Sequence, residues 1–255
     1  MNAKTNTIGT VELSFEILEV IKQNEKAGVS EVATTLGYPK STVHSHLSTL
    51  EQNGYLVCKN GAYQLGLRFL DFGENARNRK KIYKEGRAEA KELAQETDEL
   101  SSILVEEHGQ GVFLCRPEGD NAVQLDSYDG YRIHLHTTAA GKAILAYKSR
   151  DEVEAIIAQH GLPRRTQNTI VETEELFSHL EEIRERGIAF DDEERLRGLR
   201  CVAAPIRNSD DDVVATVSLA GPTSRLQKEV FREQFPSLVK SAANVIELGI
   251  KYGSS

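Results

Sequence analysis

The spacing of apolar residues predicts three helices near the start of the chain. Apolar side chains recur every three or four positions over residues 11–22, which is the period of an amphipathic helix. Residues 30–36 form a shorter helical pattern that ends at Gly37, and Pro39 begins a third that continues to about residue 52. A turn of about three residues separates the second and third patterns. Two short helices joined by so tight a turn are typical of a helix-turn-helix.

Two strand patterns follow these helices. Residues 55–58 and 62–65 are short β-prone runs separated by Lys59, Asn60 and Gly61. Asn-Gly between two such runs indicates a β-hairpin, because a type I′ turn needs a positive φ at both central positions. A hairpin directly after a helix-turn-helix predicts a winged helix-turn-helix domain.

The rest of the chain mixes helical and strand patterns. Residues from 66 to about 96 are compatible with one linker helix that carries dimer contacts. Strands are predicted at residues 101–105, 111–116, 122–128, 132–134, 200–206 and 213–220, and helices at 139–147, 151–160, 172–187 and 228–251. This mixture indicates an α+β fold. We therefore expect a winged helix-turn-helix over residues 1–72, a linker helix over 73–96 and a second domain over 97–255.

The composition is that of a protein that folds in water. Hydrophobic residues make up 39% and charged residues 27% of the 255 positions. No window approaches the roughly 18 apolar residues of a membrane span, and the polar N-terminus lacks the apolar segment of a secretory signal. These features predict a cytoplasmic protein without a membrane partner. Cys58, Cys115 and Cys201 form no CxxC pair, which indicates reduced thiols rather than disulfide bonds or a structural zinc site.

The distribution of charge changes the meaning of the net charge of −8. Residues 1–81 hold ten Lys and Arg against eight Asp and Glu, whereas residues 82–255 hold 21 against 31. Residues 77–91 carry seven cations and two acids. Because cations must displace the counterions of phosphate groups, the first part of the chain is compatible with nucleic-acid binding. The basic run also fits a solvated helix face.

The third predicted helix has a small, polar outer face. If Val43 and Leu47 point inward, helical geometry turns Ser41, Ser45 and Ser48 outward. A face of this kind can enter the major groove of duplex DNA, where the N-terminal part of a recognition helix contacts base edges. The candidate DNA-binding residues are Lys40, Ser41, Thr42, His44, Ser45 and Ser48, together with Lys59 and Asn60 at the hairpin tip. The alternative is an exposed helix of a helical adaptor.

Four stretches of the chain resemble the IclR family of transcription regulators. VSEVATTLGYPKSTVHSHLSTLEQNGYL is similar to the family's helix-turn-helix, and GAYQLGLRFLDFG to its wing and following helix. HLHTTAAGKAILA resembles the start of its effector domain, and RGIAFDDEERLRGLRCVAAPIRNSDDDVVATVSLAGPTSRL its C-terminal signature. One position departs from the family pattern, because Ser45 stands where recognition helices of the family often carry Arg. The DNA sequence preference is therefore not transferred from relatives.

The resemblance implies a GAF-like C-terminal domain whose cavity binds a small-molecule effector. The residues that it implies are Ala139, Ala140, Gly141, Asp191, Cys201, Ser218 and Leu219. A carboxylate is one candidate for the effector, because free N–H groups at a helix start attract anions. Asp191 would then accept a hydrogen bond from a ligand hydroxyl or amide, or instead be an N-cap or a solvated acid. The resemblance also implies double-stranded DNA as partner, a homodimer or homotetramer, and neither a cofactor nor a catalytic role.

Other classes of function remain open at this point. Cys201 could be the nucleophile of a thiol-dependent hydrolase, but no sequence feature places a histidine base beside it. His134 and His136, completed by Asp191 or Cys201, could hold a metal ion, whereas the favoured alternative makes Cys201 a small buried residue at the start of a strand. A third alternative is a ligand-free dimerisation module.

Overall fold

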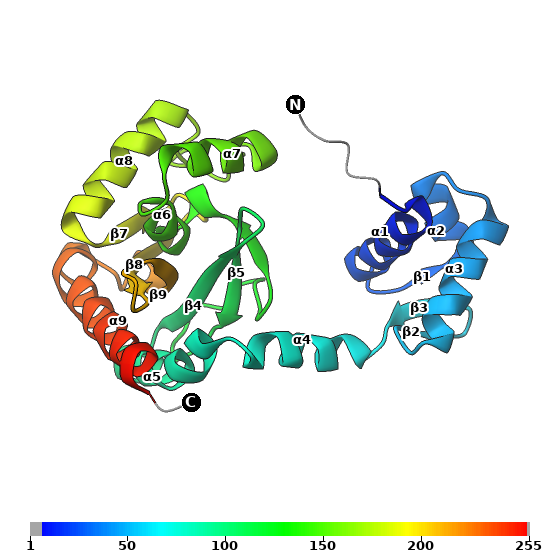
Figure 1. Cartoon of the computed structure of the whole chain (residues 1–255), viewed down its shortest axis with the longest axis horizontal. Coiled ribbons are helices and arrows are strands. Elements are labelled where there is room, and N and C mark those ends of the chain that lie inside the picture. The colour runs from blue at the N-terminus through cyan, green and yellow to red at the C-terminus, as the bar shows by residue number, and fades with distance from the viewer. Residues whose placement is uncertain (1–6, 254–255) are drawn as a thin grey trace. The chain divides into compact units, whose positions relative to one another are not determined.

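The computed structural model, which describes residues 7–253, holds its buried apolar side chains in three clusters. One cluster belongs to the unit Met1–Ala76, and the other two belong to the unit Arg77–Ser255. Figure 1 shows the first unit in blue to cyan and the second in cyan to red. The α+β fold class is confirmed. No helix within residues 7–253 is long and apolar enough to cross a membrane.

The first unit packs three helices on a small antiparallel sheet. Its helices are α1 (Gly9–Gln23), α2 (Val29–Leu36) and α3 (Lys40–Gln52). Its strands are β1 (Ala27–Gly28), β2 (Leu56–Lys59) and β3 (Ala62–Leu65), in the order β1-β3-β2. Leu13, Ile17, Val43 and Leu47 lie in the cluster that joins the helices. The helix-turn-helix and the wing are therefore as the sequence predicts, and only the two-residue strand β1 was not expected.

The wing turn has the backbone geometry that its sequence requires. Asn60 has a φ of 53° and Gly61 a φ of 79°. Lys59 pairs with Ala62, so the loop consists of these two residues alone. Positive φ at both loop positions is the requirement of a type I′ turn, and Asn followed by Gly satisfies it at little steric cost.

The segment expected as one linker helix consists of two helices. They are α4 (Arg68–Asn78) and α5 (Lys81–Thr97), which are separated at residues 79–80. Helix α4 buries no residue, whereas α5 buries Ile82, Tyr83 and Leu93 among others. These side chains belong to a core cluster of the second unit. The apolar side chains of α5 therefore belong to the core of the second unit. The charged side chains on its opposite face made the sequence resemble a solvated linker.

A six-stranded antiparallel sheet forms the centre of the second unit. Its strands are β4 (Leu100–Glu107), β5 (Gln110–Cys115), β6 (Arg132–His134), β7 (Ala189–Asp192), β8 (Leu199–Arg207) and β9 (Val213–Pro222). They lie in the order β6-β5-β4-β9-β8-β7. The expected strand at 122–128 is wrong, because those residues form no strand. Strand β7 was not predicted.

Helices cover both faces of this sheet. Figure 1 shows α5 and α9 (Phe235–Tyr252) on one side, and α6 (Ala139–Leu145) with α8 (Thr173–Arg186) on the other, beside α7 (Arg150–His160). A 3-10 turn, Leu135–Thr137, precedes α6, and a π-helical turn, Val230–Gln234, precedes α9. Alternation along β9 sends Val217 to the α9 side, whereas Ala220 belongs to the cluster on the α6 side. These three layers form the GAF-like domain.

Candidate nucleic-acid interface and small-molecule pocket

The outer face of α3 presents the predicted polar residues. Val43 and Leu47 are fully buried beneath the helix. Lys40, Ser41, His44 and Ser45 are exposed, Thr42 and Ser48 are half-buried, and Lys59 and Asn60 are exposed at the wing. The first unit therefore brings a helix with small polar side chains and a lysine-bearing hairpin tip into one small domain, which is the arrangement that a winged helix uses to contact DNA.

Hydrogen bonds within α3 define what its hydroxyl groups offer to a partner. The Ser45 Oγ donates to the Ser41 carbonyl oxygen at 3.0 Å, and the Thr49 Oγ1 donates to the Ser45 carbonyl oxygen at 2.8 Å. With its proton directed into the helix, the Ser45 hydroxyl presents lone pairs to its surroundings. His46 is turned inward, where its Nδ1 lies 2.8 Å from the Ser14 Oγ of α1. This contact fixes α3 against α1.

An inner cavity lies between the sheet and α6 in the second unit. Four of the predicted effector residues line it: Ala140, Asp191, Cys201 and Ser218. The space open to the centre of a water-sized sphere is about 30 Å³. That volume is enough for about two water molecules. The cavity is therefore small, and a larger ligand requires its walls to move.

Three other predicted effector residues lie outside the cavity wall. Ala139, the first residue of α6, is fully buried in the core cluster on that side of the sheet. Leu219 belongs to the cluster on the α9 side of the sheet, because neighbouring residues of a strand face opposite sides. The Gly141 amide donates to the Thr138 Oγ1 at 3.0 Å, and a Cβ at Gly141 would collide with the backbone of Leu135. Gly141 thus permits a close backbone approach.

Asp191 is a buried carboxyl group on strand β7. Its side chain is 1% exposed, and its Oδ1 accepts the amide protons of Glu194 at 2.7 Å and Arg195 at 3.4 Å. Burial and the nearby Glu194 carboxylate raise the pKa of Asp191 to about 7, although Lys142 and the two amides oppose the shift. The expectation of a solvated acid is wrong, because the residue faces the cavity from inside the sheet.

The surroundings of Cys201 do not activate its thiol. Burial, with a further contribution from the Asp191 carboxylate, raises the pKa of Cys201 to about 12. A nucleophilic cysteine requires a thiolate, which this environment disfavours at neutral pH. Among residues 7–253 no three His, Cys, Asp or Glu side chains converge as metal ligands would. His136 instead contacts the Pro163 carbonyl oxygen through its Nε2 at 3.2 Å.

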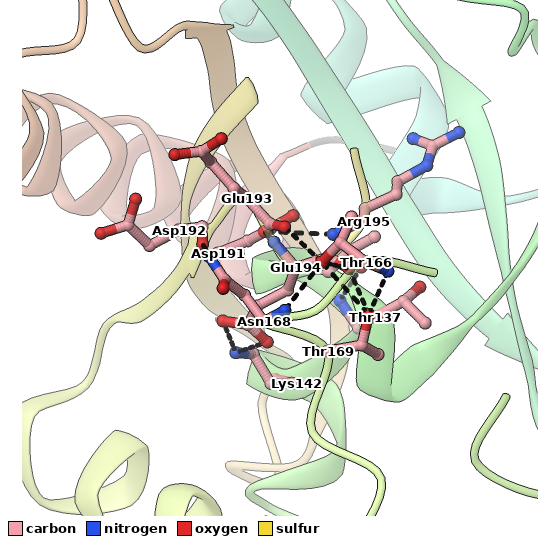
Figure 2. A network of polar contacts seen from close by, with 12 residues as sticks. Thr137, Lys142, Thr166, Asn168, Thr169, Asp191, Asp192, Glu193, Glu194 and Arg195 are labelled. Carbon is pink, nitrogen blue, oxygen red and sulfur yellow. Dashed lines mark hydrogen bonds and ion pairs between the residues drawn. The ribbon is translucent and has the colours of Figure 1, made fainter. Parts of the chain in front are cut away.

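A polar network that the sequence did not reveal fixes the segment beside the cavity. Lys142, 1% exposed, forms an ion pair with Glu194. The Thr166 Oγ1 donates to the Glu193 carbonyl oxygen at 2.6 Å, and the Thr169 Oγ1 donates to the Glu194 carbonyl oxygen at 2.7 Å. Figure 2 shows these groups joined around residues 191–195. The charged run that looked like a solvated surface is therefore part of the pocket's framework.

Two arginines in the wall of the inner cavity were also missed. Arg116 directly follows strand β5, and Arg195 is the last residue of the segment 191–195. Arg195 also borders an outer chamber of about 270 Å³, which shares Leu125, Arg195 and Leu199 with the inner cavity. Arg195 lies within a motif quoted for the family resemblance, but nothing in the sequence shows that it and Arg116 converge.

A winged helix-turn-helix joined to an α+β unit with an internal cavity defines the class of ligand-responsive transcription regulators. Comparison with family models matches residues 75–248 to the bacterial transcriptional regulator IclR C-terminal domain and residues 10–57 to the IclR helix-turn-helix domain. The chain belongs to the IclR family of DNA-binding transcription regulators, with a C-terminal effector-binding domain.

Individual relatives agree with this assignment over nearly their whole lengths. The chain is 33% identical to a probable HTH-type transcriptional regulator, ArcR, of Halobacterium salinarum, covering 98% of this chain and 97% of that protein. It matches the Thermotoga maritima IclR structure with a TM-score of 0.78 and 29% identity, covering 96% of this chain and all of that one. An IclR homologue from Microbacterium hydrocarbonoxydans in complex with 4-hydroxybenzoate matches with a TM-score of 0.81, covering 94% of this chain and 98% of that one. At 22% identity it shows a shared fold.

Proposed function

We propose that this regulator binds DNA as a homodimer or homotetramer and that an organic effector in the inner cavity changes its affinity for DNA. The observation that carries the proposal is the cavity itself. Ala140, Asp191, Cys201 and Ser218 come from separate segments and line one cavity. A small cavity lined by a buried carboxyl, a thiol and a hydroxyl is typical of a ligand site, in which a few polar groups orient the ligand.

The DNA contacts are divided between two elements. Ser41, Thr42, His44, Ser45 and Ser48 on α3 are proposed to face base edges, since the N-terminal part of a recognition helix reaches them. Lys40, Lys59 and Asn60 are proposed to contact phosphate groups. Phosphate contacts position a protein on the duplex, whereas base contacts supply sequence preference.

The proposed effector is a small organic molecule for which the inner cavity must open. The cavity, at about 30 Å³, is smaller than any such molecule. The structure of a distant homologue contains 4-hydroxybenzoate, which makes a hydroxylated organic acid one candidate here. Asp191 and the hydrogen-bonded pair of Ser102 and Ser218, whose oxygens are 2.7 Å apart, supply groups for hydroxyls.

We further propose that the protein acts in the cytoplasm by binding alone. Its relatives are transcription regulators. The raised pKa of Cys201 argues against a thiol-dependent hydrolase. No cofactor is part of the proposed function.

Recovery of genomic fragments bound by the full-length protein tests the proposal. The fragments should share an operator that competes against a shuffled duplex of the same length and base composition. Fluorescence anisotropy with that operator, repeated over a panel of metabolites, should find a compound that changes affinity in a saturable way. Equal binding to the shuffled duplex, or no response to any compound that binds the protein, would contradict the proposal.

A further inference from the structure

Three arginine side chains without acidic partners surround the inner cavity and the outer chamber. Arg116 lines the inner cavity, Arg165 lines the outer chamber and Arg195 lines both. Within residues 7–253 none of the three forms an ion pair with a carboxylate. Arg132, which also borders the outer chamber, differs because it pairs with Glu107 at 2.9 Å. In the lining of the outer chamber, Asp126 is accompanied by Arg132, Arg165 and Arg195, so positive charge exceeds negative charge there.

Arg116 has an unused donor inside the protein. Its Nη1 donates to the Ser127 carbonyl oxygen, while its Nε is buried and has no hydrogen-bond partner. The guanidinium carbon lies 5.2 Å from the centre of the Phe113 ring. Burial lowers the pKa of Arg116, and the charge of Arg195 lowers it further. An unpaired buried N–H is unfavourable, and an acceptor from a ligand would relieve that cost.

A main-chain hydrogen bond fixes the position of Arg195, and its side chain lies beside two aromatic rings. Its backbone amide donates to Asp191, so the Cα position is fixed at the cavity. Its guanidinium carbon lies 5.8 Å from the Phe113 ring centre and 5.9 Å from that of Tyr131. Figure 2 shows the side chain pointing away from the acidic cluster of residues 191–194. Arg116 and Arg195 therefore share Phe113 as a packing surface.

The acids near Arg116 and Arg195 form no ion pair with either guanidinium group. The Asp191 Oδ1 is occupied by two backbone amides, and Glu194 is paired with Lys142. Glu118, Asp129 and Asp126 raise the pKa of Arg116, but none of them forms an ion pair with it, and Asp129 pairs with Arg77 at 2.6 Å. The two guanidinium groups at the inner cavity thus lack a carboxylate in contact.

We propose that Arg116 and Arg195 form an anion clamp that binds the carboxylate of the effector where the inner cavity meets the outer chamber. The inference rests on the proposed function, because it assigns a ligand class to the same cavity. The planar fork of a guanidinium matches a carboxylate in a bidentate manner, and two such groups select an anion over its neutral analogue. The inner end then presents Asp191, Ser102 and Ser218 to hydroxyl groups of the ligand.

This placement differs from the anion site expected at the start of α6. The Gly141 amide is already bonded to Thr138, and Ala139 is buried in the core. The clamp also gives the outer chamber a role. At about 270 Å³ it accommodates the part of the ligand that the inner cavity, at about 30 Å³, cannot hold.

Matched pairs of acids and amides test the clamp on the full-length protein. The probes are pyruvate, D-gluconate, benzoate and 4-hydroxybenzoate, each beside its primary amide, titrated by calorimetry at constant ionic strength. At least one acid should bind in a saturable way, with its amide about tenfold weaker or more. Arg195→Gln and Arg116→Gln should each weaken binding of that acid by about ten- to hundredfold.

Three further variants distinguish loss of the guanidinium group from loss of the fold. Arg116→Lys and Arg195→Lys retain the charge and lose the bidentate fork, so their affinities should lie between those of wild type and the Gln variants. Arg150→Gln on α7 should bind as wild type does, because Arg150 pairs with Glu154 and Glu174 and lines neither space. Thermal unfolding of each variant reports whether it is folded.

Three results would overturn the clamp. They are equal binding of an acid and its amide, unchanged affinity in both Arg195→Gln and Arg116→Gln, and the absence of binding by all four acids. Operator affinity measured in parallel distinguishes this from a failure of the proposed function. An acid that binds through the clamp without changing operator affinity supports the clamp and contradicts the proposed function. A neutral ligand that changes operator affinity independently of both arginines supports the proposed function and contradicts the clamp.

Discussion

Asp191 combines complete burial with an ionisable group, so its protonation is linked to the stability of the fold. Its pKa of about 7 in the folded protein lies above the ordinary value of 3.8. Between these values the folded state binds a proton that the unfolded state has released. The contribution of Asp191 to stability is therefore complete below about pH 4 and is lost as the pH rises to about 7.

We predict that Asp191→Asn removes this pH dependence. The amide oxygen still accepts from the amides of Glu194 and Arg195, but the side chain no longer titrates. The melting temperature of the variant relative to wild type should therefore increase between pH 4 and pH 7 and be constant above that range. Thermal unfolding monitored by circular dichroism at several pH values measures the difference. A difference that is independent of pH, or that decreases with rising pH, would show that the carboxyl ionises normally.

Ala140 is the residue at which cavity volume can be changed without changing charge. Ala140→Leu should fill the inner cavity and lower effector affinity by about ten- to hundredfold, since overpacking of a tight site costs about 1 to 3 kcal/mol. Operator affinity without effector should be retained, because the substitution lies in the other unit. Calorimetry with a ligand that binds wild type, beside anisotropy with the operator, is the measurement. Tight binding by the folded variant would place the ligand elsewhere.

The sequence predicted some of the residues in and around the pocket but not the others. Ala140, Asp191, Cys201 and Ser218 were found through resemblance, and they do line one cavity. Leu219 was included although alternation along a strand sends it to the other face. Lys142 was missed because a buried lysine is rare and only its partner, Glu194, makes the burial possible. That pairing joins positions far apart in sequence, so no local pattern indicates it.

At the scale of secondary-structure elements, the wing was predicted correctly because its turn depends on a local backbone requirement. The wing was predictable because Asn60 and Gly61 satisfy a turn that needs positive φ twice. The segment 122–128 alternates as a strand would, yet Val123 and Leu125 are partly buried against the core without entering the sheet. Strand β7 was hidden because Asp191, a charged residue type, occupies a buried position on it. Both errors arise from tertiary contacts that override local pattern.

The wing and α3 should contribute to DNA binding in different ways. Lys59→Ala is expected to weaken binding to all sequences alike and to reduce the salt dependence of affinity by about one unit, because one phosphate contact is lost. Ser45→Ala is expected mainly to alter base preference. Anisotropy with a set of single-base operator variants at several salt concentrations measures both effects. If Ser45→Ala leaves all relative affinities unchanged, the proposed orientation of α3 is incorrect.

At the scale of the whole molecule, a homodimer imposes its symmetry on the DNA. Two copies of the winged unit should contact inverted half-sites about one helical turn apart, roughly 34 Å, or a multiple of that spacing. Footprinting on a recovered operator should show paired protected regions, and moving one half-site by about five base pairs should weaken binding by placing it on the other side of the duplex. Protection of a single half-site by a monomer is the result that rules out this arrangement.

Helix α4 connects the two units while burying no side chain of its own. An isolated helix of about this length is marginal in water, so local opening near residues 79–80 costs little compared with unfolding either core. Brief digestion with trypsin should therefore cut near Arg79, an exposed residue between α4 and α5, before it cuts within the core of either unit. Each fragment would keep its own core, but the winged units would be released from the proposed dimer. The gain in affinity that arises when two linked units bind neighbouring half-sites would disappear, although every contact with a single half-site remained.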